Sequence, residues 1–257
     1  MGCCLLVLAA WLVAAPAAAA ETSGSPGLAR LLSSGTLRVG MSGTQPPLNF
    51  RDKGGQMVGL EVDLARSLAG LMRVELAIVE KPFAELLGAL AAGEVDVVLS
   101  GMTATPERSM RSAFAGPYFL SGKSILTRSA ALAQVDDAGA LDQASLRLVA
   151  LEGSTSVDFV RSALPKAKLV TVASYDEAVK LLLADKANAL VADREVVALT
   201  AFLHPKEGLA TLRAPLTIEP IGIAAPASDL LLARYLDTAL DALEASGVLS
   251  AIRARWL

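Results

Sequence analysis

Side chains that could bind a charged small molecule gather in one short segment of the sequence. Ser100, Gly101 and Thr103 precede Arg108, and the sequence predicts that this arginine lies in the first turn of a helix. A cation in the first turn opposes the helix dipole, so Arg108 needs an anionic partner. That partner is either a protein carboxylate, such as Glu107, or a ligand carboxylate that the guanidinium holds with two hydrogen bonds.

Two further segments have a similar character. Gly153, Ser154 and Thr155 form a glycine loop that opens a predicted helix, where N–H groups can bind an anion or Ser154 can simply cap the helix. Asp193 directly follows the apolar run 189–192, and its carboxylate suits an ammonium group or the cap of a following helix. The three segments together offer donors for a carboxylate and an acceptor for an amine, which are the two charged groups of an α-amino acid.

Short apolar runs alternate with amphipathic segments along the chain, and this pattern occurs twice. The first series predicts strands at 37–41, 74–79 and 95–99 and helices at 60–72 and 83–92. The second predicts strands at 146–151, 169–172 and 189–192, helices at 154–163 and 174–184, and then a strand at 221–225 and a long helix to Ala245.

Two such series predict an α/β protein of two lobes, with mostly parallel sheets flanked by helices. Ligands of such sheets bind at the carboxyl ends of the strands, which is where the three polar segments lie.

The composition argues against several classes of protein. The 257 residues are 53% hydrophobic and 19% charged, enough for one large domain or two small ones. A net charge of −3 argues against nucleic-acid binding. Because His204 is the only histidine and Cys3 and Cys4 are the only cysteines, we expect neither a metal site nor a cofactor.

The first 20 residues predict an export signal. They carry no charged side chain, and the small residues before Glu21 suit cleavage after Ala20. A single membrane anchor is the alternative, which the shortness of the apolar run disfavours. Cleavage would remove both cysteines and leave a periplasmic protein, with residues 21–35 as a flexible lead-in.

Three stretches of the sequence are distinctive in their order along the chain: Gly59–Ala65, the loop 100–108 and the terminal segment 247–256. Together they resemble family 3 of the periplasmic solute-binding proteins of amino-acid ABC transporters, over about Thr36–Leu257. The resemblance implies the type II periplasmic-binding-protein fold, with a ligand cleft between two lobes. It implies a lobe 1 of 36–123 plus 220–257, a lobe 2 of 127–215, and hinge crossovers near 124–126 and 216–219.

The resemblance also implies roles for the polar residues. Arg108 would hold the ligand α-carboxylate, helped by Thr103 and by the Thr155 amide across the cleft. The Gly101 carbonyl, the Thr103 hydroxyl and Asp193 would hold the ammonium, and Ser100 would contribute from the same loop. Phe83 lies where the family often places an aromatic wall, although it could also belong to the core.

The sequence departs from the family in the loop that follows the first strand. Gln45 stands where most members have an aromatic side chain, and Leu48 stands where they have phenylalanine. The loss of a cation–π surface argues against a basic amino acid. It favours a polar or smaller ligand, or a carboxylate that is not an amino acid.

The expected function is therefore that of a monomeric binding protein. It would close its lobes on an amino acid or similar small carboxylate and deliver it to an inner-membrane ABC permease. The alternative is an enzyme like the periplasmic cyclohexadienyl dehydratases, which the fold also resembles. Such an enzyme needs a general acid in the cleft, and besides Asp193 the carboxylates near the polar segments are Glu195 and Glu152. A sensor or lytic-enzyme module is a third alternative.

Overall fold

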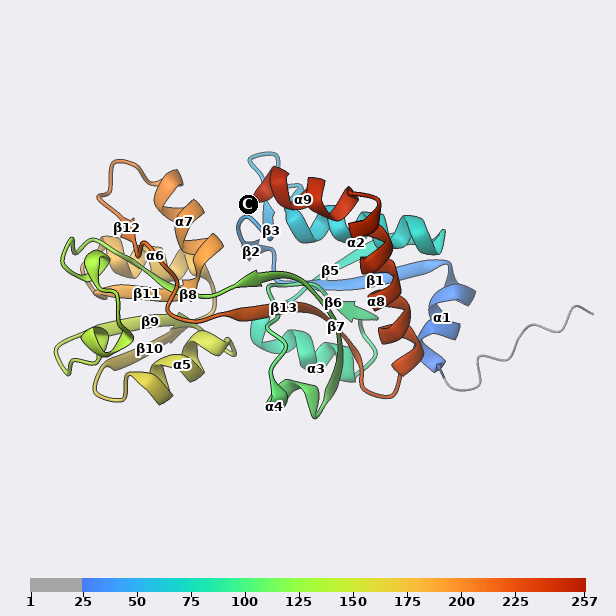
Figure 1. Cartoon of the computed structure of the whole chain (residues 1–257), viewed down its shortest axis with the longest axis horizontal. Helices are drawn as coiled ribbons and strands as arrows, with labels where there is room; N and C mark the ends of the chain where they lie inside the picture. The colour runs from blue at the N-terminus through green and yellow to red at the C-terminus, as the bar shows by residue number, and fades with distance from the viewer. Residues whose placement is uncertain (1–24) are drawn as a thin grey trace, which may run out of the picture.

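The computed structural model describes residues 25–257. The chain forms two open five-stranded sheets that lie at opposite ends of the long axis, each covered by helices (Figure 1). We call the unit around each sheet a lobe. No helix among the described residues is both long and apolar enough to cross a membrane.

The first lobe is built on the sheet with strand order β5-β1-β6-β13-β7. Strands β5, β1 and β6 run parallel, whereas β13 is antiparallel to both of its neighbours. The strands of this sheet are β1 (Thr36–Met41), β5 (Glu75–Glu80), β6 (Val97–Val98), β7 (Ser112–Ser121) and β13 (Glu219–Pro226). A small sheet beside it holds β2 (Thr44–Gln45), β3 (Asn49–Arg51) and β4 (Met57–Val58).

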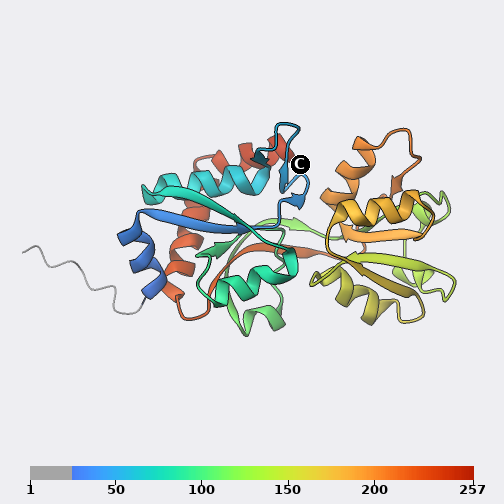
Figure 2. The same ribbon diagram turned by 180° about the vertical axis from the view of Figure 1, so that it is seen from behind.

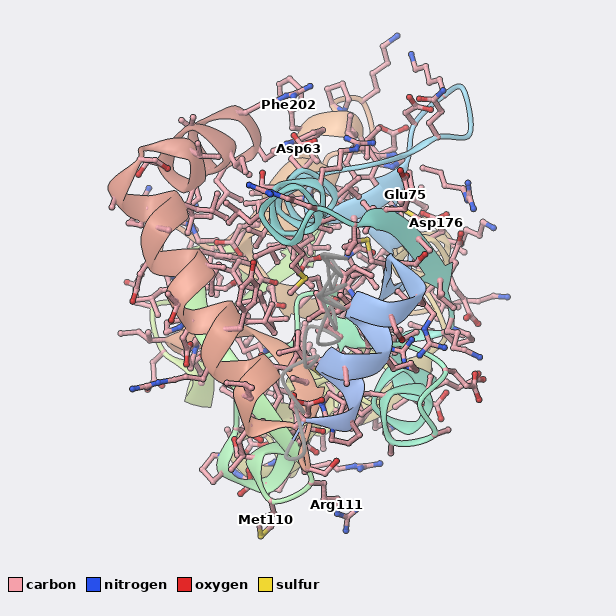
Figure 3. All side chains as sticks on the ribbon, turned by 90° about the vertical axis from the view of Figure 1, so that its right-hand side faces the viewer. Asp63, Glu75, Met110, Arg111, Asp176 and Phe202 are labelled. Atoms are coloured by element: carbon pink, nitrogen blue, oxygen red, sulfur yellow. The ribbon has the colours of Figure 1, made fainter. Side chains whose placement is uncertain are left out.

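Helices cover both faces of this first sheet. The pair α2 and α8 packs on one face and α3 on the other, so Val97 and Val98 of β6 point into different apolar clusters. Asp63 of α2 (Figure 3) accepts a hydrogen bond from the Trp256 indole of α9 at 2.8 Å, and this bond joins the C-terminal helix to the lobe. The helical segments are α1 (Pro26–Ser34), α2 (Leu60–Met72), η1 (Phe83–Glu85), α3 (Leu86–Ala91), α4 (Pro106–Ser109), α8 (Leu230–Ala245) and α9 (Val248–Trp256).

The second lobe is built on the sheet with strand order β10-β9-β11-β8-β12. Strands β10, β9 and β11 are parallel, and β8 is antiparallel to its neighbours. The strands are β8 (Lys123–Thr127), β9 (Arg147–Leu151), β10 (Lys168–Val172), β11 (Ala189–Asp193) and β12 (Ala210–Thr211). The helical segments are η2 (Leu132–Gln134), η3 (Ala138–Leu141), α5 (Thr155–Ala163), α6 (Tyr175–Leu183) and α7 (Arg194–Leu203).

Two segments cross between the lobes. One leads from β7 through Gly122 into β8, and the other leads from β12 into β13; both are visible from either side (Figures 1 and 2). A Cβ on Gly122 would lie 2.0 Å from the Thr217 carbonyl oxygen, so the close approach of the two segments requires glycine. The Lys123 N–H donates to the Thr217 hydroxyl at 2.9 Å and fixes their register.

The predicted α/β fold of two lobes is confirmed. The sheets are less parallel than expected, because the crossing strands β7, β8 and β13 add antiparallel pairs to both. The expectation of a flexible lead-in over 21–35 is wrong for residues 26–34, which form helix α1 with Leu28 and Leu31 buried. The predicted leader and the cleavage after Ala20 lie outside the described residues.

Candidate functional site

The polar segments singled out in the sequence meet where the two lobes join. The loop after β6 lies beside the start of β13, where the Ala104 N–H donates to the Pro220 carbonyl at 2.9 Å. The N-terminus of α5 faces this loop from the second lobe, since the Thr103 and Thr155 hydroxyl oxygens are 3.3 Å apart. A cavity of about 800 Å³ opens at this junction, with walls that include Thr103, Arg108, Gly153, Thr155, Asp158 and Glu219.

Arg108 bridges the two lobes through main-chain oxygens. Its Nη1 donates to the Thr103 carbonyl and its Nη2 to the Gly153 carbonyl, both at 2.9 Å. The Phe83 ring centroid lies 5.9 Å from its Cζ. Among the described residues no carboxylate oxygen lies within 4.0 Å of this guanidinium, so Glu107 is not the partner. Arg108 is partly buried, and its guanidinium hydrogen-bonds to neutral main-chain acceptors.

Burial lowers the pKa of Arg108 below its ordinary value, and the negative charges of Asp158, Asp193 and Glu219 oppose this effect. The guanidinium stays charged, because an arginine pKa lies far above neutral pH. Thr105 caps the short helix α4 by accepting the Arg108 N–H at 3.2 Å, as its position in the sequence predicts. This cap fixes the backbone position from which the Arg108 side chain extends.

Two hydroxyl groups from opposite lobes meet on one carboxylate. Glu219 Oε2 accepts from the Thr103 hydroxyl at 2.8 Å and from the Thr155 hydroxyl at 3.0 Å. Glu219 begins strand β13, so this carboxylate belongs to a crossing segment. Burial by itself raises the pKa of Glu219, but Lys123 and the hydrogen bonds from both threonines lower it further than burial raises it. The group is therefore ionised at neutral pH.

The ammonium group of Lys123 lies between two carboxylates. Its Nζ is 2.6 Å from Asp193 Oδ1 and 3.3 Å from Glu219 Oε2, and the side chain is 1% exposed. Asp193 ends β11 at the cap position of α7, yet its carboxylate makes no capping hydrogen bond. The carboxylate that the sequence assigned to an ammonium does hold one, and that ammonium belongs to the protein itself.

Gln45, Ser100 and Ser42 form a buried polar cluster next to this junction. The Gln45 amide nitrogen donates to the Ser100 carbonyl and to the Ser100 and Ser42 hydroxyls, each at 3.0 Å. Gln45 is 1% exposed and Ser100 is 0% exposed. The loop turns at Gly101, whose φ is +58° and where a Cβ would lie 2.6 Å from Gln45 Oε1.

The buried carboxyl of Glu61 ties this loop to helix α2. It accepts the Gly101 N–H at 2.6 Å, an Asn49 amide N–H at 2.5 Å and the Tyr118 hydroxyl. Burial raises the pKa of Glu61 above its ordinary value of 4.5, although these three hydrogen bonds act in the opposite direction. Glu61 therefore positions the loop that carries Thr103.

The remaining predicted residues occupy related positions. Phe83 is 5% exposed and belongs to an apolar cluster, as the core interpretation expects, and it also borders Arg108, while its role as a wall for a ligand stays a prediction. Ser154 precedes α5, but its hydroxyl donates backward to the Leu151 carbonyl at 2.7 Å instead of capping the helix. The junction thus brings together Arg108, Thr103, Thr155 and Asp193, with the cluster of Gln45, Ser100 and Gly101 beside them.

Sequence reasoning missed Lys123, Glu219 and the role of Glu61. A single lysine shortly before the apolar residues Ile125 and Leu126 was a usable signal, because a lysine is rarely buried unless it is paired. Glu219 is likewise a charged residue at the start of a buried strand. Within residues 25–257, no group of three His, Cys, Asp or Glu side chains lies close enough to hold a metal ion.

The sequence matches the model of the bacterial extracellular solute-binding proteins, family 3, over residues 37–257. The chain belongs to this family. The resemblance that the sequence indicated is thereby confirmed.

Relatives within the solute-binding family differ in what they do. The L-arginine-binding protein of Pseudomonas aeruginosa is 30% identical and covers 86% of this chain and 87% of its own. The cyclohexadienyl dehydratase of the same organism is 27% identical and covers 90% of this chain and 85% of its own. Most of the curated relatives compared are binding proteins, whereas the cyclohexadienyl dehydratase is an enzyme.

Solved structures of the family agree with the fold. An ancestral amino acid-binding protein described as a precursor of cyclohexadienyl dehydratase superposes with a TM-score of 0.81 at 30% identity and covers 89% of this chain and 98% of its own. Holo ArgBP from T. maritima gives 0.78 at 31% identity, covering 84% and 93%. The two-lobed architecture is thus shared with structures of amino-acid-binding proteins.

Proposed function

We propose that this solute-binding protein captures a small carboxylate, either an amino acid or a related organic acid, by closing its lobes, and passes it to an ABC permease. The observation that carries the proposal is Arg108, a charged side chain at the lobe junction whose two terminal nitrogens meet only main-chain carbonyls. A ligand carboxylate would give this guanidinium a charged, bidentate partner. Closure of two lobes over such a ligand is a known hinge motion.

Each residue at the junction has a proposed part in binding. Arg108 binds the carboxylate, with help from the Thr103 hydroxyl and the Thr155 N–H from the other lobe. Asp193 and the Gly101 carbonyl face the second polar group of the ligand. The wall is formed by Phe83, Gln45, Ser100 and Ser154.

We also propose that the protein works outside the cytoplasmic membrane as a monomer. The uncharged apolar leader and the family's description as extracellular both support export, with cleavage after Ala20. The proposal of a permease partner is supported by relatives such as the ABC transporter arginine-binding protein 1 of Escherichia coli, which is 27% identical to this chain.

The test is a thermal-shift titration with amino acids and small organic acids on protein freed of copurified ligand. A ligand that raises the Tm of the native protein should produce no shift in Arg108→Ala, because the bidentate contact is lost. Arg111→Ala is the matched control, since Arg111 projects from the outer surface near α4 and is exposed (Figure 3). An unchanged shift in Arg108→Ala would contradict the assignment of the site.

A dehydratase is the second candidate, because one curated relative is such an enzyme. Glu195 is the candidate for its general acid among the residues named from the sequence, because burial raises its pKa more than a hydrogen bond from Ser121 lowers it. However, Glu195 lines a cavity of about 370 Å³ together with Pro47 and Trp256, whereas Arg108 lines the cavity beside Thr103. This separation favours binding without catalysis. Turnover of prephenate or arogenate by the purified protein, and its loss in Glu195→Gln, would support the enzyme instead.

A further inference from the structure

The two crossing segments place an ion pair of the protein at the junction itself. Lys123 comes from the segment that enters β8, and Glu219 comes from the segment that enters β13. Their charged atoms are 3.3 Å apart, and both residues are buried. They are 96 positions apart in the sequence, so only the fold brings them together.

This pair reproduces the two charged ends of an amino acid on the groups that would bind one. The ammonium of Lys123 lies on Asp193, the acceptor assigned to a ligand ammonium. The carboxylate of Glu219 accepts the Thr103 hydroxyl, which was assigned to the ligand, and the Thr155 hydroxyl, which lies on the residue whose N–H was assigned to the ligand carboxylate. The ammonium end of the site therefore already has a charged partner within the chain, whereas Arg108 at the carboxylate end meets only main-chain carbonyls.

The occupied acceptor disfavours a second ammonium group. A ligand ammonium bound to Asp193 would lie next to the Lys123 ammonium. Two neighbouring positive charges repel each other more strongly at a buried site than in water. Glu219 offsets part of this repulsion, but the Lys123 ammonium cancels one of the two carboxylate charges that a ligand ammonium would otherwise meet in full. An ammonium has three N–H donors, and the contacts with Asp193 and Glu219 use two of them. The third can donate to an oxygen acceptor on a ligand.

We propose that the ligand is a small carboxylate that carries an oxo or hydroxyl oxygen in place of the α-ammonium, and that Lys123 and Glu219 determine this specificity. The inference rests on the proposed function, since it requires a carboxylate at Arg108. It adds that Lys123 donates to the oxygen at the adjacent carbon. Asp193 and Glu219 then serve to orient the Lys123 ammonium.

Isothermal titration of matched pairs tests the proposal. Each pair differs only at the α-carbon: 2-oxoglutarate with L-glutamate, pyruvate and L-lactate with L-alanine, and phenylpyruvate with L-phenylalanine. In any pair that binds, we expect the oxo or hydroxy acid to bind at least about tenfold more tightly than the amino acid. A tighter amino acid overturns the proposal and leaves the proposed function intact.

A variant separates the part played by Lys123 from the rest of the site. Lys123→Gln frees Asp193 from the ammonium, so the preference should shift toward the amino acid by at least about tenfold. Lys168→Gln, at the exposed start of β10, is the control and should leave the preference unchanged. An unaltered preference in a folded Lys123→Gln protein overturns the role of Lys123.

The remaining outcomes also decide between the two proposals. If Lys123→Gln does not fold, the matched pairs on the native protein still test the ligand class. If no member of any pair binds to ligand-free protein, the proposed carboxylate site is contradicted, and the specificity proposal falls with it.

Discussion

The carboxyl of Glu61 shows how one buried residue can position a loop of the proposed site. Glu61 has no proposed contact with the ligand itself. It accepts hydrogen bonds from Gly101, Asn49 and Tyr118, which come from three separate segments. Loss of such an acceptor leaves buried donors without partners, which is more costly than loss of an exposed hydrogen bond.

The pH dependence of stability reports on Glu61. Because its pKa is raised in the folded protein, the proton binds more tightly there than in the unfolded chain. The stability from this proton is complete below about pH 4.5, the ordinary value, and is lost as the pH rises through the raised folded pKa. We expect Glu61→Gln, measured by urea unfolding from pH 4 to 8, to show a smaller loss of stability than the native protein. Glu75→Gln, on the exposed start of β5 (Figure 3), should keep the native slope.

Gly101 can be tested against another glycine. Its φ of +58° and the nearby Gln45 Oε1 leave no room for a side chain, so Gly101→Ala should destabilise the protein by at least about 1–2 kcal/mol and weaken ligand binding. Gly88 lies within α3 with no atom within 4 Å of a built Cβ, so Gly88→Ala should stabilise by about 0.5–1 kcal/mol. Equal effects in thermal unfolding would contradict the special geometry of Gly101.

At the scale of elements, Asp229 joins two helices that lie far apart in the sequence. It caps α8 by accepting the Leu232 N–H at 3.1 Å, and it also accepts the Leu28 N–H of α1 at 2.9 Å and the Ser25 hydroxyl. Asp229 is 0% exposed. Helix α1 is thus fixed to the first lobe by a residue at the other end of the chain.

Removal of this side chain should therefore affect both helices. We expect Asp229→Ala to lower the free energy of unfolding by about 2–4 kcal/mol, from the lost cap and the buried donors. Ser174→Ala removes only the cap of α6, where the hydroxyl accepts the Glu177 N–H, and should cost about 1 kcal/mol. Chemical denaturation measures both. A loss for Asp229→Ala no larger than for Ser174→Ala would contradict the double role.

Elements with a local signal were predictable from the sequence. The apolar spacing of residues 60–72 predicts α2 with its observed bounds, and Ser174 and Asp229 mark helix starts by their capping chemistry. Strands β7 and β8 were not assigned, because their pairing with distant strands leaves no local pattern and Gly116, Pro117 and Gly122 interrupt the apolar run.

The same distinction applies to the site. Arg108 and Asp193 were found because each follows a strand in its own βα unit. Lys123 and Glu219 were missed because Lys123 matters through its ion pairs with Glu219 and Asp193. These residues are far apart in the sequence, and no local spacing predicts the contacts. Helix α1 was missed for a similar reason, since its apolar face, with Leu28 and Leu31, is buried against distant segments.

At the scale of the whole molecule, polar contacts hold the two lobes together. Thr103 of the first lobe meets Thr155 of the second, and both bind Glu219 on the crossing strand. Arg108 adds its hydrogen bond to the Gly153 carbonyl. All of these contacts lie within the chain, so lobe closure does not depend on a ligand alone.

Thr155→Val removes the hydroxyl from this set while keeping the shape of the side chain. The loss of its contacts with Glu219 and Thr103 should destabilise the closed arrangement by about 1–2 kcal/mol, which favours open molecules by about tenfold. Small-angle X-ray scattering without ligand should then give a larger radius of gyration than for the native protein. Thr171→Val, on an exposed position of β10, is the control. Identical radii would contradict a role for Thr155 in closure.

The burial of Lys123 also has a kinetic consequence. With 1% of its side chain exposed, this ammonium can be reached from solvent only after the lobes separate. The rate at which ligand enters then rises with ligand concentration only until it equals the rate of spontaneous opening, and it levels off there. Lobe opening then limits the rate of ligand capture, so raising the concentration of an already abundant solute does not speed its capture further.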